Sequence, residues 1–275
     1  MKTLLLCLFL ASEMMGYSLF ETKKSIDNRH LNLIHTIKDI VITTQKTRGL
    51  TNNYMNGNVV AQLLVHGQRK EMMKNFAQVD RRFKELELPG HYYQDASKLM
   101  LKSKKLNKKA FKNDSAKVFA AYSSIIEAWM DLNEAVITTH FSKREPVIYQ
   151  EVKLLNNVLL PLTENIGKMR GMGSGIVARS YCQEKEAIKM QSFVDEIQRY
   201  TLLLENHMSG MAYTALGQNE FYVIRRNIND YAELTLDEVI GKSDIKLITN
   251  EYFDQGTAAI SDVLKIYNVI SSSLK

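Results

Sequence analysis

Apolar residues recur at steps of three and four along most of this chain, and that spacing limits its fold more than any other feature. Leu31, Ile34, Ile37, Ile40 and Val41 are the first clear example, because they would line one face of a helix. Only three prolines occur in 275 residues, so few long helices would be interrupted. With 45% hydrophobic residues, the chain can bury a large core. We therefore predict an all-α fold rather than a sandwich or barrel.

Turn signals divide the chain into eight predicted helices in two sets of four. Asn56-Gly57 and Pro89-Gly90 mark turns in the first half, and Pro146 starts the second. Ser209-Gly210 falls where the first half has its Leu88-Pro89-Gly90 stop, with Gly210 lying 122 residues after Leu88 (210 − 88 = 122). The predicted helices span about 25–54, 59–86, 92–111, 116–141, 147–180, 183–207, 218–240 and 250–271. Pro161 lies inside the fifth and predicts a kink.

Turns at matching offsets indicate duplication of a helical bundle. Short connections between the helices favour antiparallel neighbours. We therefore predict two tandem up-down four-helix bundles related by internal duplication. The predicted boundaries are 1–18 for a signal peptide, 19–145 for the first bundle and 146–275 for the second.

The first 18 residues resemble an export signal. Lys2 gives a positive start, residues 4–11 form a short apolar core, and Gly16-Tyr17-Ser18 supplies a small-x-small cleavage site. The apolar core is too short to anchor in a bilayer, which takes roughly 18 or more apolar residues. We expect the signal peptide to be cleaved and the protein to work in a bacterial periplasm.

Charge and motifs exclude several function classes. The net charge of +6 is mild for this length and lacks the dense basic patches of a nucleic-acid binder. The six histidines are dispersed, and the sequence has no Glu-x-x-His pair or Cys-x-x-Cys-His motif. It also lacks Walker loops, Gly-x-Ser-x-Gly elbows and zinc-protease motifs. We expect no metal or other cofactor, no nucleic-acid partner and no enzymatic activity.

An Arg-Gly pair occurs twice inside the predicted helices. Arg48-Gly49 and Arg170-Gly171 lie 122 residues apart (170 − 48 = 122), each with a lysine two positions before the arginine. Within an apolar helix, arginine carries a charge that is costly to bury, and glycine costs roughly 1 kcal/mol of helix stability against alanine. Their recurrence at equivalent places predicts a polar site in each half. We expect Lys46 and Lys168 to be solvated, because a residue two positions away points off the arginine's face.

The residues around these pairs suit a small anion. A guanidinium keeps its charge and presents a planar fork of donors that matches a planar oxyanion. Thr44 and Gln45 can share a helical face with Arg48, and glycines next to the arginines would let a ligand or a backbone approach closely. The candidate binding residues are Arg48, Arg170, Thr44, Gln45, Gly49 and Gly171.

A purely structural role for the same residues is the alternative. The arginines would then cap or salt-bridge neighbouring helices, and the glycines would only allow tight packing. Gly167, Gly171 and Gly175 recur every four residues, forming a stripe where another helix could pack unusually close.

Two motifs resemble those of a known sensory family. Gln45-Lys46-Thr47-Arg48-Gly49-Leu50-Thr51 is similar to the Gln-x-Glu-Arg-Gly-x-Ser signature of the nitrate- and nitrite-sensing (NIT) domain. Residues 165–173 resemble its second-half counterpart, and residues 251–260 its last-helix pattern. Thr47 stands where the family usually has Glu, and the second half lacks the Gln. The resemblance implies two four-helix bundles and a sensor whose arginines, one from each half, hold a small anion.

We therefore expect a free-standing exported module that senses nitrate, nitrite or a similar small anion. Domains of this family are normally joined to a kinase, chemoreceptor or RNA-binding output, so the signal would pass through a partner. The candidate partners are a membrane histidine kinase or chemoreceptor, and a second copy of the chain in a homodimer. The alternative is a helical interaction or scaffold protein with no small-molecule ligand, and an unrecognised enzyme is a third.

Overall fold

The computed structural model of the protein is built from helices. It describes residues 2–86, 88–209 and 216–274, with side chains from Asn28 onward, and these ranges contain no strand. The helices are α1 (Lys2–Met55), α2 (Ala61–Glu85), α3 (Gly90–Lys109), a short η1 (Ala110–Lys112), α4 (Ser115–Phe141), α5 (Pro146–Leu154), a π turn η2 (Leu155–Leu159), α6 (Leu160–Arg179), α7 (Glu184–Ser209), α8 (Gln218–Glu238) and α9 (Thr249–Ser273). The predicted all-α class is confirmed.

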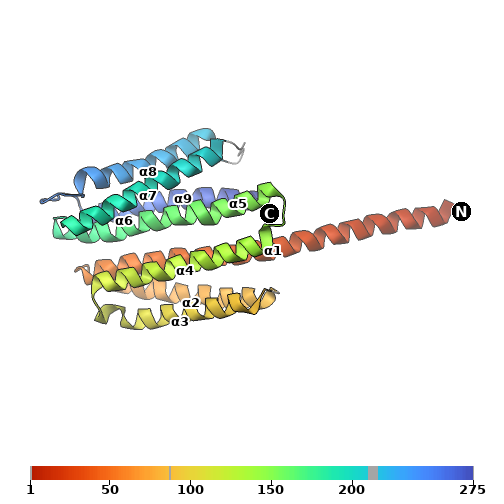
Figure 1. The fold of residues 1–275 in the computed structure, drawn as a ribbon, viewed down its shortest axis with the longest axis horizontal. Coiled ribbons are helices and arrows are strands. Elements are labelled where there is room, and N and C mark those ends of the chain that lie inside the picture. Colours follow the sequence, from red (N-terminus) through yellow and green to blue (C-terminus); the bar gives the residue numbers. More distant parts are fainter. Residues whose placement is uncertain (1, 87, 210–215, 275) are drawn as a thin grey trace.

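Helices α1 to α4 pack together around one apolar core (Figure 1). Helix α1 lies against α2 and α4, and α3 lies against α4. Trp129 of α4 is fully buried in this core, and its ring stacks on Phe76 of α2 with centroids 6.2 Å apart. Asp114 caps the start of α4, since its carboxylate accepts a hydrogen bond from the backbone N–H of Lys117 at 3.0 Å.

Helices α5 to α9 surround a second core, in which α6 lies against α7 and α9. The predicted fifth helix is present as α5, η2 and α6 in direct succession. Pro161 is near the start of α6, directly after the π turn, and the kink expected there stays a prediction. A proline has no N–H to donate, and a π turn is one of the ways in which a helix absorbs that loss.

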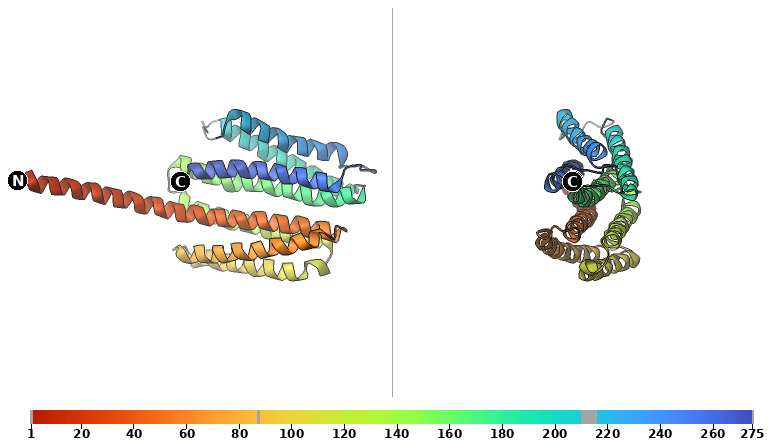
Figure 2. Two further views of the ribbon diagram at one scale, coloured as in Figure 1. Left: turned by 180° about the vertical axis from the view of Figure 1, so that it is seen from behind. Right: turned by 90° about the vertical axis from the view of Figure 1, so that its left-hand side faces the viewer.

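Helices α1 and α6 lie side by side where the two sets meet, with α4 against α1 and α9 against α6 (Figure 2). Gly167, Gly171 and Gly175 of α6 all face α1. A Cβ atom on each would lie 3.3 Å from Arg48, 3.6 Å from the backbone of Gly49 and 3.4 Å from the Asn52 side chain, respectively. The glycine stripe is therefore confirmed as a surface for close helix packing.

The two sets repeat the same neighbour relations. Helix α1 contacts α2 and α4, and α6 contacts α7 and α9 in the same order along the chain. A duplication would produce this arrangement. The duplication itself and the boundary between residues 145 and 146 stay predictions.

Parts of the sequence interpretation fall outside the described residues. The side chains of the predicted signal peptide, residues 1–18, are among these, and so is the turn expected at Gly210. Helix α1 begins at Lys2 and its first part extends beyond the two sets (Figure 1). In the part of the chain that the structure describes, no helix combines the length and apolar composition needed to cross a bilayer.

We predict that Gly173→Ala destabilises the protein by about 1–3 kcal/mol, because overpacking a core has that cost. A Cβ atom there would lie 2.3 Å from the hydroxyl and 2.5 Å from a ring carbon of Tyr252, which is 1% exposed and has little room to move. Gly67→Ala is the control, since nothing lies within 4 Å of an added Cβ atom at that position in α2. It should stabilise by up to about 1 kcal/mol. Urea unfolding midpoints measure both, and unchanged stability of Gly173→Ala would contradict the packing of α9 on α6.

Candidate functional site

Two deeply buried arginines lie at the junction of α1 and α6. Arg48 of α1 is 0% exposed, and Arg170 of α6 is 2% exposed. A guanidinium at this depth is costly unless its charge is balanced and its donors are hydrogen-bonded. The surroundings of each arginine therefore show what the site can bind.

Arg48 is held by a carboxylate, a hydroxyl and an aromatic ring. Its Nη1 donates to the Glu164 carboxylate of α6 and, at 2.8 Å, to the Ser123 hydroxyl of α4. Its guanidinium carbon lies 4.7 Å from the centre of the Phe119 ring, also on α4. Glu164 is 2% exposed, so the ion pair is buried on both sides. The structural alternative raised by the sequence, an arginine that salt-bridges a neighbouring helix, therefore describes Arg48.

Arg170 has an equivalent hydroxyl and an equivalent ring but no carboxylate. Its Nη1 donates to the Thr257 hydroxyl at 2.8 Å, and its guanidinium carbon lies 4.6 Å from the centre of the Phe253 ring. Both partners are on α9, four residues apart, as the two α4 partners of Arg48 are. Among the described residues, no Asp or Glu forms an ion pair with Arg170.

Each arginine has one edge of its guanidinium without a protein partner. The Nε and Nη2 atoms of both are buried and make no hydrogen bond to any described residue. On a guanidinium these two N–H groups point in parallel, and this is the edge that binds a planar oxyanion with two hydrogen bonds. A buried donor without a partner costs about 1–3 kcal/mol and is rare in native proteins. Two such edges at one junction point to a ligand that accepts hydrogen bonds.

The charge around Arg170 is unbalanced. Burial lowers the pKa of Arg170 to about 10, and the positive charge of Arg48 lowers it as well, whereas Tyr231 and Glu164 raise it. Tyr231 does not supply a negative charge, because burial holds the pKa of its hydroxyl well above the usual value. Arg170 is thus still a cation at neutral pH, with no anionic side chain in contact.

Three other predicted residues lie at the arginine pair. Gln45 is 1% exposed, and its amide nitrogen donates to the Thr163 hydroxyl at 3.3 Å. Its Oε1 has no hydrogen-bond partner among the described residues. A Cβ atom on Gly49 would lie 3.7 Å from Nη2 of Arg170, and one on Gly171 would lie 3.6 Å from Cα of Gly49. The two glycines therefore let the helices approach, and Gly49 lies under the free edge of Arg170.

Two threonines next to Arg48, Thr44 and Thr47, direct their hydroxyls into α1 itself. Thr44 donates to the carbonyl of Ile40 at 2.7 Å, and Thr47 donates to the carbonyl of Thr43 at 2.8 Å. Thr44 is fully buried, but its hydroxyl hydrogen is already used within the helix. Its role toward a ligand stays a prediction.

The lysine expectation holds for Lys46, which is exposed, and is wrong for Lys168. The Lys168 side chain is 18% exposed, and its ammonium lies 2.9 Å from a Glu127 oxygen and 3.7 Å from a Glu164 oxygen. Residues four apart on a helix are neighbours, so α6 itself places this lysine beside Glu164.

Five partners of the arginines were not among the predicted site residues: Glu164, Ser123, Thr257, Phe119 and Phe253. Two features of the sequence accompany these residues, and each becomes specific only once the helices are placed against one another. One is a single acidic residue on the apolar stretch before Arg170. The other is a Phe followed four residues later by a hydroxyl side chain, which occurs on the last helix of each set.

A groove of about 490 Å³ gives solvent access to the partners of Arg48. Phe119 and Ser123 of α4 line it, as do Lys168 of α6 and Lys189 of α7. The groove thus lies between the two sets of helices, on the α4 side of the junction.

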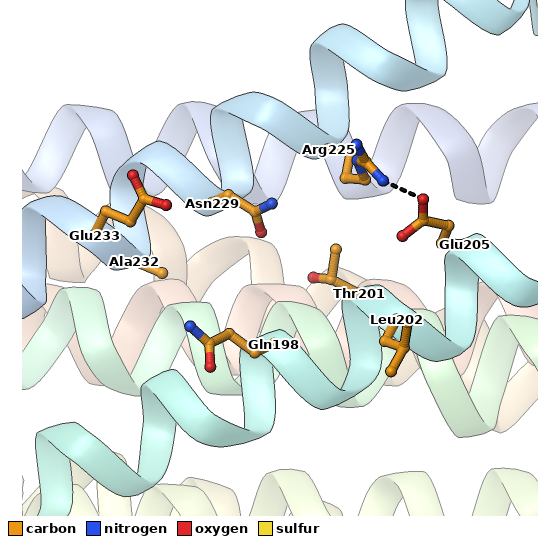
Figure 3. Close-up of a pocket in the computed structure, with 8 residues that line it drawn as sticks. All are labelled: Gln198, Thr201, Leu202, Glu205, Arg225, Asn229, Ala232 and Glu233. Carbon is orange, nitrogen blue, oxygen red and sulfur yellow. Dashed lines mark hydrogen bonds and ion pairs between the residues drawn. The ribbon is translucent and has the colours of Figure 1, made fainter.

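A second cleft, of about 210 Å³, lies between α7 and α8 and suits an anion less well (Figure 3). Arg225 is the one cation among the described residues that line it, and it already pairs with Glu205 across the cleft. The Arg225 side chain is 30% exposed, and Glu233 adds another negative charge. Among the described residues, no group of three or more His, Cys, Asp or Glu side chains could hold a metal ion.

Comparisons with known proteins show the family and the fold of the chain. The family model for nitrate and nitrite sensing (NIT) matches residues 39–275. The structure of the NasR transcription antiterminator is similar, with a TM-score of 0.68 and 13% sequence identity over 94% of this chain and 73% of that one. At that identity the likeness supports the fold alone. No curated protein sequence matches the chain significantly.

The two arginines should respond differently to replacement by methionine. Arg48→Met leaves Glu164 buried with only Lys168 nearby, so we expect a loss of about 3–5 kcal/mol of unfolding free energy. Arg170→Met removes a buried charge that no carboxylate balances, and it should be neutral or stabilising. Thr257 keeps a partner in that variant, because its hydroxyl also donates to the carbonyl of Phe253 at 2.9 Å. Urea unfolding in low-salt buffer measures both, and equal losses would contradict the asymmetry described above.

Proposed function

The chain belongs to the nitrate- and nitrite-sensing family, and on that premise we propose that it binds nitrate, nitrite or a similar small planar anion between Arg48 and Arg170. One observation carries the proposal: both arginines are buried, and both keep the Nε–Nη2 edge free of protein partners. Nitrate is planar and carries one negative charge over three oxygens, so it can accept from two such edges at once.

Binding would use groups that are already in position. Thr257 and Ser123 fix the Nη1 atoms of the two guanidiniums, and the phenylalanine rings cover one face of each. The arginines are therefore preorganised, and little side-chain freedom is lost when an anion binds. Gln45 and the backbone near Gly49 and Gly171 would complete the walls of the site.

A ligand held by both arginines would tie α1 to α6. These helices belong to different sets, so the ligand would favour the arrangement in which the sets are closest at the junction. A ligand shifts such an equilibrium only by its difference in affinity for the two arrangements. We propose that a membrane histidine kinase or chemoreceptor binds the protein and responds to this change in helix packing. We also propose that the protein works in the periplasm after removal of residues 1–18. It catalyses no reaction in this proposal.

An interaction protein without a small-molecule ligand is the second candidate. The observation that favours it is a group of exposed apolar side chains at the start of α2: Val59, Val60, Leu63 and Leu64 are 54–76% exposed. Exposed apolar patches commonly mark contact surfaces for other proteins. A protein of this kind would not respond to anions.

We predict that nitrate raises the melting temperature of the wild-type protein. At about 100 times the dissociation constant, a ligand adds about 2.7 kcal/mol, or roughly 5–10 °C for a chain of this length. Nitrate, nitrite and chloride would be compared as sodium salts at equal ionic strength, in a thermal-shift assay. Arg170→Ala should abolish the nitrate response, because it removes the free edge that has no competing carboxylate.

Arg225→Ala is the matched control. It removes an arginine from the cleft between α7 and α8, where the guanidinium is paired and half-buried, and it should keep the full nitrate response. An equal response to all three anions, or an unchanged nitrate response in Arg170→Ala, would overturn the proposal and favour the second candidate.

A further inference from the structure

Glu164 is a negative charge built into the arginine site. It lies on α6, six residues before Arg170, and is 2% exposed. One carboxylate oxygen accepts from Nη1 of Arg48 and lies 3.7 Å from the Lys168 ammonium, and the other oxygen has no partner among the described residues. A carboxylate this deep interacts strongly with any other charge that enters the site, because little water screens it.

The charges at the site can be counted. Three ionised side chains at the junction are at most 2% exposed: Arg48 and Arg170 are positive and Glu164 is negative, which leaves +1 (2 − 1 = 1). Lys168 and Glu127 form an ion pair at the edge of the site, and their charges cancel. One monovalent anion would therefore bring the buried charge to zero.

We infer that Glu164 sets the charge selectivity of the site, so that monovalent oxyanions are accepted and divalent ones of similar size, such as sulfate, are rejected. The inference rests on the proposed function, because it concerns the anion that the arginines bind. A dianion would leave the buried groups with a net charge of −1, and an unbalanced buried charge is strongly unfavourable. The dianion would also face the Glu164 carboxylate directly, and like charges that meet in a buried site repel each other strongly.

Two variants change the net buried charge of the site in opposite directions. Glu164→Gln keeps the shape of the side chain and raises the buried charge from +1 to +2. Gln45→Glu also keeps the shape and lowers it to 0. Gln45 is 1% exposed and lies near the Arg48 guanidinium. Both side chains approach Gly167, where an added Cβ atom would lie 3.7 Å from Oε1 of Gln45 and 3.3 Å from Nη2 of Arg48. A carboxylate at position 45 could pair with the free edge of Arg48, so this variant should fold.

Glu127→Gln is the matched control. It removes a carboxylate that contacts the same lysine, but the Glu127 side chain is 53% exposed and solvent screens its charge. If Glu164→Gln changes selectivity only because Lys168 loses a partner, Glu127→Gln should change selectivity as well. If the buried charge of Glu164 is the cause, Glu127→Gln should keep the wild-type selectivity.

The test is isothermal titration of the wild-type protein and the three variants with sodium nitrate and sodium sulfate at equal ionic strength. We expect the wild type and Glu127→Gln to bind nitrate and not sulfate. Glu164→Gln should bind sulfate at least about tenfold more tightly than the wild type does, and Gln45→Glu should bind nitrate at least about tenfold more weakly.

The outcomes separate this inference from the proposed function. If the wild type binds nitrate but Glu164→Gln keeps the wild-type ratio of nitrate to sulfate affinity, the inference fails and the proposed function stands. If Glu164→Gln does not fold, Gln45→Glu decides, and nitrate binding at wild-type affinity in that variant would overturn the inference. If the wild-type protein binds neither anion, the proposed function fails and the inference fails with it.

Discussion

The burial of two guanidiniums at one helix junction is the constraint to which the rest of the fold is fitted. Each needs an acceptor for its donors, a surface for its flat face and room for its length. Ser123 and Thr257 supply the acceptors, phenylalanine rings supply the surfaces, and glycines supply the room. Gly167 lies beside Arg48, and Gly49 lies beside Arg170. These groups come from α1, α4, α6 and α9, so the arginines connect the first and last helices of both sets.

The sequence predicts the parts of this arrangement that are local. Helices follow from apolar spacing, and their ends from turn residues, so most predicted helices match the structure to within a few residues. The repeated Arg-Gly pairs stand out because both residues are unfavourable in an apolar helix, and the structure brings Arg48 and Arg170 to one junction. The glycine stripe can be predicted from the sequence because helical residues four apart share a face.

The partners of the arginines could not be predicted, because they come from other helices. A Phe and a hydroxyl four residues apart are ordinary on any amphipathic helix, so Phe119 and Ser123 carry no signal until α4 is placed against α1. Lys168 was expected in solvent because its own helix turns it away from Arg170. What holds it is Glu127 of α4, across the junction. The sequence predicts a kink at Pro161 but not the π turn before it, since sequence does not show how a helix absorbs a missing donor.

The near-symmetry of the junction makes its one asymmetry informative. Both arginines have a ring and a hydroxyl in equivalent places, but the carboxylate of Glu164 reaches only Arg48. The buried positive charge is therefore concentrated on the α6–α9 side, and an anion would be attracted first to Arg170. It would then compete with Glu164 for Arg48, and any gain on the α1 side would be reduced by the loss of that ion pair. The net energy with which an anion would draw α1 toward α6 is thus the energy of its contact with Arg48 minus the energy of the Glu164 ion pair that it displaces. A change at Glu164 alone would alter this difference without changing the fold.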